Sequence, residues 1–207
     1  MRRCIDAVLF DFGGVLAEEG FRNGLYEIAS RNGMDPAAFF ETARLLIAST
    51  GYLTGRSTEA RYFAELRRRT GLREDDVTMR KTILDGFVMR PWMVDLVKRL
   101  AENWIRTAVL SDQTDWLDEL EGRLGFSRLF ERVFNSYHMG KSKSDPSLFK
   151  DVLSCMGLEA ARTLFVDDTE GHVERARSVG INAVHYRERE QAFREISSFF
   201  PGIRLVT

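Results

Sequence analysis

The segment IDAVLFDFGGVL, from Ile5 to Leu16, is the strongest indication of the fold of this chain. Its apolar run from Ala7 to Phe10 has the length and composition of a buried strand. The run ends at Asp11, and the glycines Gly13 and Gly14 then permit a tight turn. Open α/β sheets bind their ligands at the carboxyl ends of the strands, so this stretch predicts such a sheet with a functional carboxylate at its edge.

A second segment, RTLFVDDTEG from Arg162 to Gly171, repeats the arrangement far downstream. Here an apolar strand delivers Asp167 and Asp168 to the same edge of the predicted sheet. Adjacent carboxylates near a third are costly to hold unless a cation balances them, and Mg²⁺ prefers oxygen ligands. We therefore predict that Asp168 binds Mg²⁺ directly and that Asp167 acts as a more distant or water-mediated ligand. The alternative is a solvated acidic turn.

Buried-strand patterns alternate with helical ones through most of the chain. The predicted strands are Ala7–Phe10, Thr107–Leu110, Arg132–Phe134, Thr163–Val166 and Ala183–Tyr186. Strands that alternate with helices indicate a parallel sheet with right-handed crossovers. The fold class predicted is therefore α/β, with a Rossmann-like parallel sheet as its core.

The interval between the first two strands is too long for a simple crossover. It contains several helical periods and no convincing strand. One helix is predicted to start at Asp35 with Pro36, a second is predicted to be capped by Ser57, and a third is predicted over Val77–Phe87. One helix is enough for a crossover, so the others predict an inserted α-helical cap over the carboxyl edge of the sheet. We assign residues 1–17 and 90–207 to the core domain and residues 18–89 to the cap domain.

Bulk composition excludes several classes of protein. The 207 residues carry a formal net charge of −1, so no global field attracts nucleic acid or anionic membranes. We find no run of the about 18 apolar residues that a membrane span needs, and the start of the chain does not match a signal peptide. The two cysteines, Cys4 and Cys155, indicate neither a disulfide framework nor a zinc site. We expect a cytoplasmic monomer or homodimer without nucleic-acid or membrane partners.

The residues at the sheet edge suit phosphoryl transfer. A carboxylate such as Asp11 can attack phosphorus and form an aspartyl-phosphate, although an Asp at a strand end is also a common turn former. Backbone N–H groups of Gly13 and Gly14 can approach phosphate oxygens. A hydroxyl at Ser111, at the end of the second strand, can donate to a phosphate oxygen. The ammonium of Lys143 can offset the charge on the carboxylate and the phosphoryl group.

Taken together, these segments resemble the haloacid dehalogenase-like hydrolases. The motifs of that family occur in order, as Asp11 with its glycine turn, Ser111, Lys143, and the pair Asp167 and Asp168. The resemblance covers nearly the whole chain, with the helical insert in the place of that family's first-type cap. The stretch FVDDTEGHVERARSVG is especially similar to sugar-phosphate phosphatases and to the N-terminal phosphatase domain of soluble epoxide hydrolases.

The resemblance implies a role for each motif residue. Asp11 would be the nucleophile and a Mg²⁺ ligand, and the main-chain carbonyl of Gly13 and the carboxylate of Asp168 would complete the protein ligands. Ser111 and Lys143 would orient the phosphoryl group. The resemblance also favours Lys143 over its local competitor, Lys141.

Three positions depart from the pattern of the family. Gly13 stands where its phosphatases usually carry an Asp that protonates the leaving group and later activates water, help worth roughly 10²–10⁴-fold. Asp112 stands where Asn is common and places extra negative charge in the phosphate-binding region. Ser144 replaces a usual Pro, with an effect expected only on loop stiffness. Either the leaving group needs little protonation, as in an anomeric, acyl or aryl phosphate, or another acid replaces the missing one. The candidates are Asp112, Glu18 and Glu19.

The function predicted is a Mg²⁺-dependent phosphatase for a small organic phosphate, with a sugar phosphate favoured. One alternative is a non-catalytic module that binds Mg²⁺ and phosphate. The other is a 2-haloacid dehalogenase in which Asp11 attacks carbon, against which the acidic pair argues. His172 and three arginines of the insert are expected at the surface, although they are within reach of the site. The arginines are Arg22, Arg44 and Arg56.

Overall fold

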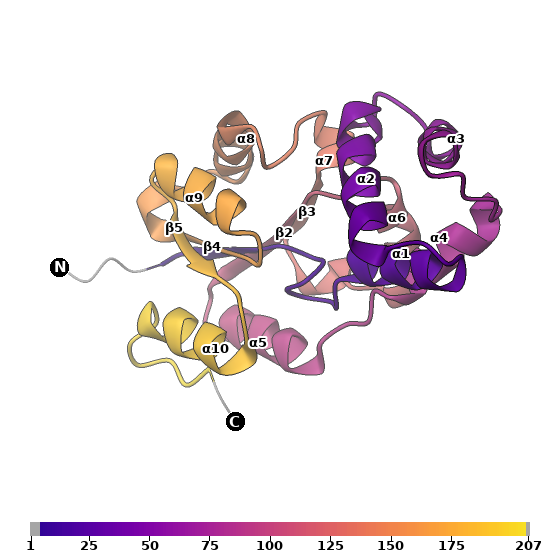
Figure 1. Cartoon of the computed structure of the whole chain (residues 1–207). Coiled ribbons are helices and arrows are strands. Elements are labelled where there is room, and N and C mark those ends of the chain that lie inside the picture. The colour runs from indigo at the N-terminus through magenta and orange to yellow at the C-terminus, as the bar shows by residue number, and fades with distance from the viewer. Residues whose placement is uncertain (1–4, 206–207) are drawn as a thin grey trace.

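A computed structural model describes residues 5–205 and contains one parallel sheet in that range. The strands lie in the order β3-β2-β1-β4-β5 (Figure 1). Their bounds are β1 Ala7–Phe10, β2 Arg106–Ser111, β3 Arg132–Asn135, β4 Thr163–Asp167 and β5 Asn182–His185. The predicted fold class is confirmed, and the ends of each predicted strand lie within one residue of the ends observed.

The strand order places both acidic segments at the point where the topology switches direction. β1 and β4 are hydrogen-bonded neighbours, with Phe10 paired to Val166. The next residue continues the ladder, since the Asp11 N–H donates to the Val166 carbonyl at 2.9 Å. From β1 the chain proceeds to β2 and β3 on one side, and it returns through β4 to β5 on the other. Ligands of open α/β sheets bind at this position, outside the carboxyl ends of the strands.

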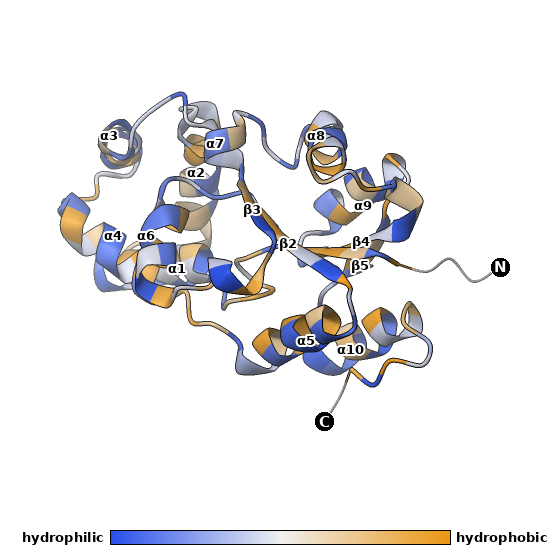
Figure 2. Ribbon diagram, turned by 180° about the vertical axis from the view of Figure 1, so that it is seen from behind, coloured by the Kyte–Doolittle hydropathy of each residue, from blue (hydrophilic) through white to orange (hydrophobic). Residues whose placement is uncertain are grey.

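Helices cover both faces of the sheet. Figure 1 shows α8 (Pro146–Met156) and α9 (Glu170–Ser178) on one face, and α5 (Pro91–Glu102) and α10 (Arg189–Ser198) on the other. Alternate strand residues point to opposite faces, so Leu9 and Phe165 pack with the first pair while Val8, Phe10 and Val166 pack with the second. Hydrophobic and hydrophilic residues alternate along these helices in Figure 2, as expected for helices with one buried side.

The insert between β1 and β2 is helical, and it lies at the end of the sheet toward which β1 runs (Figure 1). Asp35 caps its second helix as predicted, accepting from the Ala38 N–H at 2.7 Å. The expectation that Ser57 caps the next helix is wrong by one residue, because Thr58 accepts from the Arg61 N–H. Its helices are α1 Gly20–Arg31, α2 Pro36–Ser49, α3 Glu59–Thr70 and α4 Asp76–Asp85, with a 3₁₀ turn at Tyr52–Thr54.

An aromatic junction fastens the insert to the core. Trp116, the first residue of α6 (Trp116–Leu124), is almost fully buried and packs against rings of the insert. Its indole N–H donates to the Glu59 carboxylate at 2.6 Å. The rings around it are those of Phe21, Tyr52, Tyr62 and Phe63. The two connecting segments also pair, since the Glu18 N–H donates to Val88 and the Arg90 N–H donates to Leu16.

The remaining described elements are short. They are the helix α7 at Ser136–Met139 and the 3₁₀ turns at Ser127–Leu129 and Ala160–Arg162. No helix in residues 5–205 combines the length and hydrophobicity needed to cross a membrane. Cys155 is a free, exposed thiol, whereas Cys4 and the basic start of the chain lie outside the described residues.

Replacing Trp116 with Ala tests the aromatic junction. Loss of a buried indole leaves a cavity among the rings of the insert, so we expect the free energy of unfolding to fall by about 3–5 kcal/mol in urea denaturation. Trp104→Ala is the matched control, since this indole is 93% exposed and its loss should change stability by no more than about 0.5 kcal/mol. Equal effects of the two substitutions would contradict a stabilising junction.

Candidate active site

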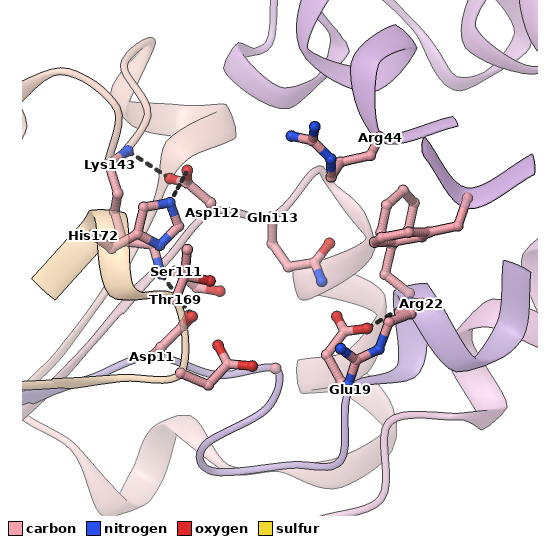
Figure 3. A pocket seen from close by; sticks show the side chains of 14 residues that line it. Asp11, Glu19, Arg22, Arg44, Ser111, Asp112, Gln113, Lys143, Thr169 and His172 are labelled. Atoms are coloured by element: carbon pink, nitrogen blue, oxygen red, sulfur yellow. Dashed lines mark hydrogen bonds and ion pairs between the residues drawn. The ribbon is translucent and has the colours of Figure 1, made fainter. Parts of the chain in front are cut away.

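A cavity of about 210 Å³ opens between the carboxyl edge of the sheet and the insert (Figure 3). The core supplies one group of lining residues, Asp11, Gly13, Ser111, Asp112, Gln113, Lys143, Asp168, Thr169 and His172. The insert supplies the other group, Glu19, Phe21, Arg22, Phe40 and Arg44. The fold therefore gathers residues from across the sequence around a single cavity.

A buried ion triad forms the floor of this site. The Lys143 ammonium lies 2.7 Å from Asp11 Oδ2 and 2.6 Å from Asp167 Oδ2. Asp11 and Asp167 extend from adjacent strands, while Lys143 comes from the loop before α8. The second carboxylate oxygen of each Asp accepts a backbone N–H, from Phe12 for Asp11 and from Thr169 for Asp167. Lys143 and Asp167 are completely buried, and Asp11 retains a small exposed fraction toward the cavity.

Burial and charge act against each other in this triad. Burial raises the pKa of Asp11 well above its usual range, Lys143 lowers it, and the neighbouring carboxylates raise it again. Burial also acts to raise the pKa of Asp167, but the charges of Lys143 and His172 hold it below its ordinary value. Although burial alone would lower the pKa of Lys143, the surrounding carboxylates raise it, so this ammonium stays protonated.

A second layer of contacts surrounds the triad. His172 Nδ1 lies 3.2 Å from Asp167 Oδ1, and its Nε2 lies 3.8 Å from Asp112 Oδ2. Asp112 Oδ1 accepts the backbone N–H of Lys143 at 2.8 Å, which holds the lysine loop in place. Burial raises the pKa of Asp112. His172 therefore belongs to the cavity wall and not to the outer surface expected from the sequence. Its place in the first turn of α9, directly after the acidic segment, was the available signal.

The glycine turn after β1 leaves room for the carboxylate of Asp168. Gly14 has a φ of +78°, a conformation that L side chains rarely adopt. A Cβ at this position would lie 2.2 Å from Asp168 Oδ2, so a side chain at residue 14 would displace the carboxylate. Burial, together with the charge of Asp167, raises the pKa of Asp168. The turn and the acidic segment are thus sterically matched.

The donor set suits a hard divalent cation. Asp11, Asp167 and His172 offer ligand atoms that all lie within 4.8 Å of one another. Asp168 lines the same cavity, as does Gly13. Three carboxylates share this floor with one ammonium, and oxygen donors with excess negative charge match the preferences of Mg²⁺. Among the described residues, Asp11, Asp167 and His172 are close enough together to hold a metal ion.

The other sequence candidates separate into residues inside and outside the cavity. Ser111 is buried at the end of β2 and lines the cavity. Arg56 instead donates to the Gly140 carbonyl at 3.3 Å, and Lys141 pairs with Asp151 at the surface. Ser144 lies 2.5 Å from Ser142 through their hydroxyls, within the loop that precedes α8.

Three of the curated proteins that resemble this chain match it over part of their length. Drimenol cyclase drtB of Aspergillus calidoustus is 32% identical over 72 residues, which cover 35% of this chain and 14% of that protein. Flavin mononucleotide hydrolase 1 of Arabidopsis thaliana is 22% identical over 119 residues, or 58% of this chain and 49% of that protein. Bifunctional epoxide hydrolase 2 of Sus scrofa is 25% identical over 121 residues, or 55% and 21%. The chain thus matches about half or less of the length of these relatives.

Solved structures share the fold over nearly the full chain. A HAD family enzyme from Bacteroides thetaiotaomicron, in complex with magnesium and inorganic phosphate, has a TM-score of 0.71 and 23% identity, with coverage of 91% of this chain and 98% of that one. L-2-haloacid dehalogenase from Xanthobacter autotrophicus has a TM-score of 0.66 and 21% identity, with coverage of 94% and 83%. The family model for haloacid dehalogenase-like hydrolases matches residues 5–180. This chain therefore belongs to the haloacid dehalogenase-like hydrolases.

Proposed function

We propose that this hydrolase is a Mg²⁺-dependent phosphatase that acts on a small organic phosphate through an aspartyl-phosphate on Asp11. The observation that carries the proposal is the position of the Asp11 carboxylate, which is held at the cavity floor by a buried ammonium. A carboxylate placed in this way can attack phosphorus, and the reaction is divided into two easier steps.

Each neighbour has a physical role in this mechanism. The Lys143 ammonium, 2.7 Å from Asp11 Oδ2, favours the ionised nucleophile and attracts the phosphoryl oxygens. The Ser111 hydroxyl lines the same cavity and can donate to a phosphoryl oxygen. The buried carboxylate of Asp167 holds the lysine in position through a 2.6 Å ion pair. The positions of the attacking group and of the positive charge are thus set before substrate binds.

The cation would be held by Asp11 and Asp168, with the Gly13 carbonyl as a further oxygen ligand and Asp167 as a more distant one. When bound, Mg²⁺ would neutralise negative charge on the phosphoryl group during transfer. Asp11 and Asp168 both line the cavity, which leaves their carboxylates accessible to an ion. Burial, and after it the neighbouring carboxylates, raises the pKa of both groups. A bound cation would offset the repulsion between these carboxylates.

The cavity favours a small polar substrate. Its volume of about 210 Å³ lies below the range of roughly 300–1,000 Å³ of pockets that hold drug-sized ligands. The side that belongs to the insert carries Arg22 and Arg44 beside the rings of Phe21 and Phe40, and Gln113 adds an amide from the core. Hydroxyl groups suit such donors and acceptors, which supports a sugar phosphate as the substrate class.

Hydrolysis of p-nitrophenyl phosphate tests the proposed function. We expect turnover with Mg²⁺, loss of turnover with EDTA, and recovery when Mg²⁺ is restored. Asp11→Asn should lower kcat by at least about a thousandfold, because the amide removes the nucleophile. Binding of Mg²⁺ without turnover would instead support a non-catalytic module. Chelator-resistant halide release from a 2-haloacid would support a dehalogenase.

The two lysines of the loop provide a matched pair of substitutions. Lys143→Ala should abolish measurable phosphatase activity and lower the free energy of unfolding by about 3–5 kcal/mol, because the buried Asp167 loses its ammonium partner and keeps only His172 as a basic neighbour. Lys141→Ala, which removes an exposed ion pair with Asp151, should preserve both activity and stability. Steady-state kinetics and urea denaturation measure the two effects. Comparable losses in the two variants would contradict the assignment of Lys143.

A further inference from the structure

We propose that Glu19 is the general acid and base of the reaction, in place of the carboxylate that Gly13 lacks. This inference rests on the proposed phosphatase function. Glu19 lies at the start of the insert and immediately precedes α1. It would give a proton to the leaving group and later take one from the attacking water.

The first argument is the position of the carboxylate. A Cβ built on Gly13 would lie 3.7 Å from Glu19 Oε1, so the Glu19 side chain reaches the region into which a side chain at position 13 would extend. Both residues line the cavity that contains Asp11. Figure 3 shows Glu19 and Arg22 on one side of this cavity, with Lys143, Asp112 and His172 on the other. A glutamate from the insert thus supplies a carboxylate where the β1 loop has none.

The second argument is that Glu19 is held in a defined orientation. Its Oε2 accepts the Arg22 N–H at 2.6 Å, which caps α1. With Oε2 engaged in this bond, Oε1 is the oxygen that faces Gly13. Burial raises the pKa of Glu19, which helps the carboxyl to carry a proton before the leaving group departs.

The other two candidates for the missing acid are placed less favourably. Glu18 is half exposed and pairs with Arg90 at 2.8 Å, and it does not line the cavity. Asp112 accepts the Lys143 backbone N–H and faces His172, so it lies on the side of the cavity that is proposed to bind the phosphoryl group. Phosphoryl transfer places the attacking and leaving oxygens roughly in line. The leaving group therefore points away from Asp11 toward the insert, where Glu19 lies.

The proposed steps balance in atoms and charge. Asp11 Oδ forms a bond to phosphorus while the bond from phosphorus to the leaving oxygen breaks, and that oxygen takes the proton of the Glu19 carboxyl. The Glu19 carboxylate then takes a proton from water as the water oxygen bonds to phosphorus. The bond between phosphorus and Asp11 breaks, which releases inorganic phosphate and restores both side chains.

Glu19→Gln separates catalysis from helix capping, because the amide oxygen can still accept the Arg22 N–H but cannot transfer a proton. With glycerol phosphate, whose alkoxide leaving group needs protonation, we expect kcat/KM to fall by roughly 10²–10⁴-fold. The leaving group of 2,4-dinitrophenyl phosphate needs no proton. With this substrate the rate of the first turnover should therefore stay within about threefold of the wild-type rate, a change far smaller than the loss of acid–base help would cause. The next turnovers should be slow, and aspartyl-phosphate should accumulate in rapid-quench samples.

Two further variants sharpen the experiment. Glu18→Gln is the matched control and should keep the activity on both substrates. Adding Gly13→Asp to the Glu19→Gln variant should raise kcat/KM for glycerol phosphate at least about tenfold above that of Glu19→Gln alone, because general acid–base help is restored. A Cβ at position 13 would lie 3.1 Å from Cε1 of Phe87. This contact is close, so the Phe87 ring must shift slightly to make room for the aspartate.

The outcomes distinguish this inference from the proposed function. If Glu19→Gln retains wild-type turnover of glycerol phosphate, or slows the first turnover equally with both substrates, Glu19 is not the acid. In either case wild-type activity would show that the phosphatase assignment stands. If the wild-type protein turns over neither phosphate ester with Mg²⁺, the phosphatase assignment itself fails.

Discussion

The ammonium of Lys143 is buried between two carboxylates at the topological switch point, and this contact organises the site. An ammonium and two carboxylates out of water are tolerable only when they compensate one another. Lys143 contacts Asp11 at 2.7 Å and Asp167 at 2.6 Å, so the loop before α8 must meet the ends of β1 and β4. The same contacts that satisfy burial also set the position of the proposed nucleophile.

Steric matching completes this arrangement around the triad. Gly14 provides a left-handed turn and, through the absence of a side chain, the space that Asp168 occupies. The Asp112 carboxylate accepts the backbone N–H of Lys143 and so anchors the lysine loop. His172, which lies in α9, contacts the buried Asp167. Carboxylates from three strand ends are thus held near one another by backbone donors, one ammonium and one imidazole. Such crowding suits a site that binds a cation and a phosphoryl group.

The insert contributes more than a cover for the site. Its aromatic junction with Trp116 fixes α1 and α3 against the core, and α1 begins at the cavity. Because Glu19 both caps α1 and faces Gly13, the position of the insert and the proposed proton transfer are coupled through one residue. A glycine in the β1 loop and a glutamate in the insert can thus be understood together, as parts of the proposed catalytic site.

The α/β class, the strand positions and the helical insert were predictable from the sequence alone. Buried parallel strands are continuous apolar runs, so Ala7–Phe10 and Thr163–Val166 could be read directly. Caps with a strong local signal, such as Asp35 before Pro36, were equally readable, whereas the choice between Ser57 and Thr58 was not, because neighbouring hydroxyls can serve equally well. The motif residues Asp11, Ser111, Lys143 and Asp168 were named from order and resemblance, and the fold brings them to one cavity.

The three-dimensional fold was needed to show which polar residues around these motifs face the cavity. Glu18 and Glu19 are adjacent in the chain, yet one pairs with Arg90 and the other lies beside Gly13. Arg44 lines the cavity while Arg56 contacts Gly140. The physical reason is that side-chain direction depends on how each helix is rotated and docked. Packing over long sequence distances sets that rotation, and no local pattern encodes it.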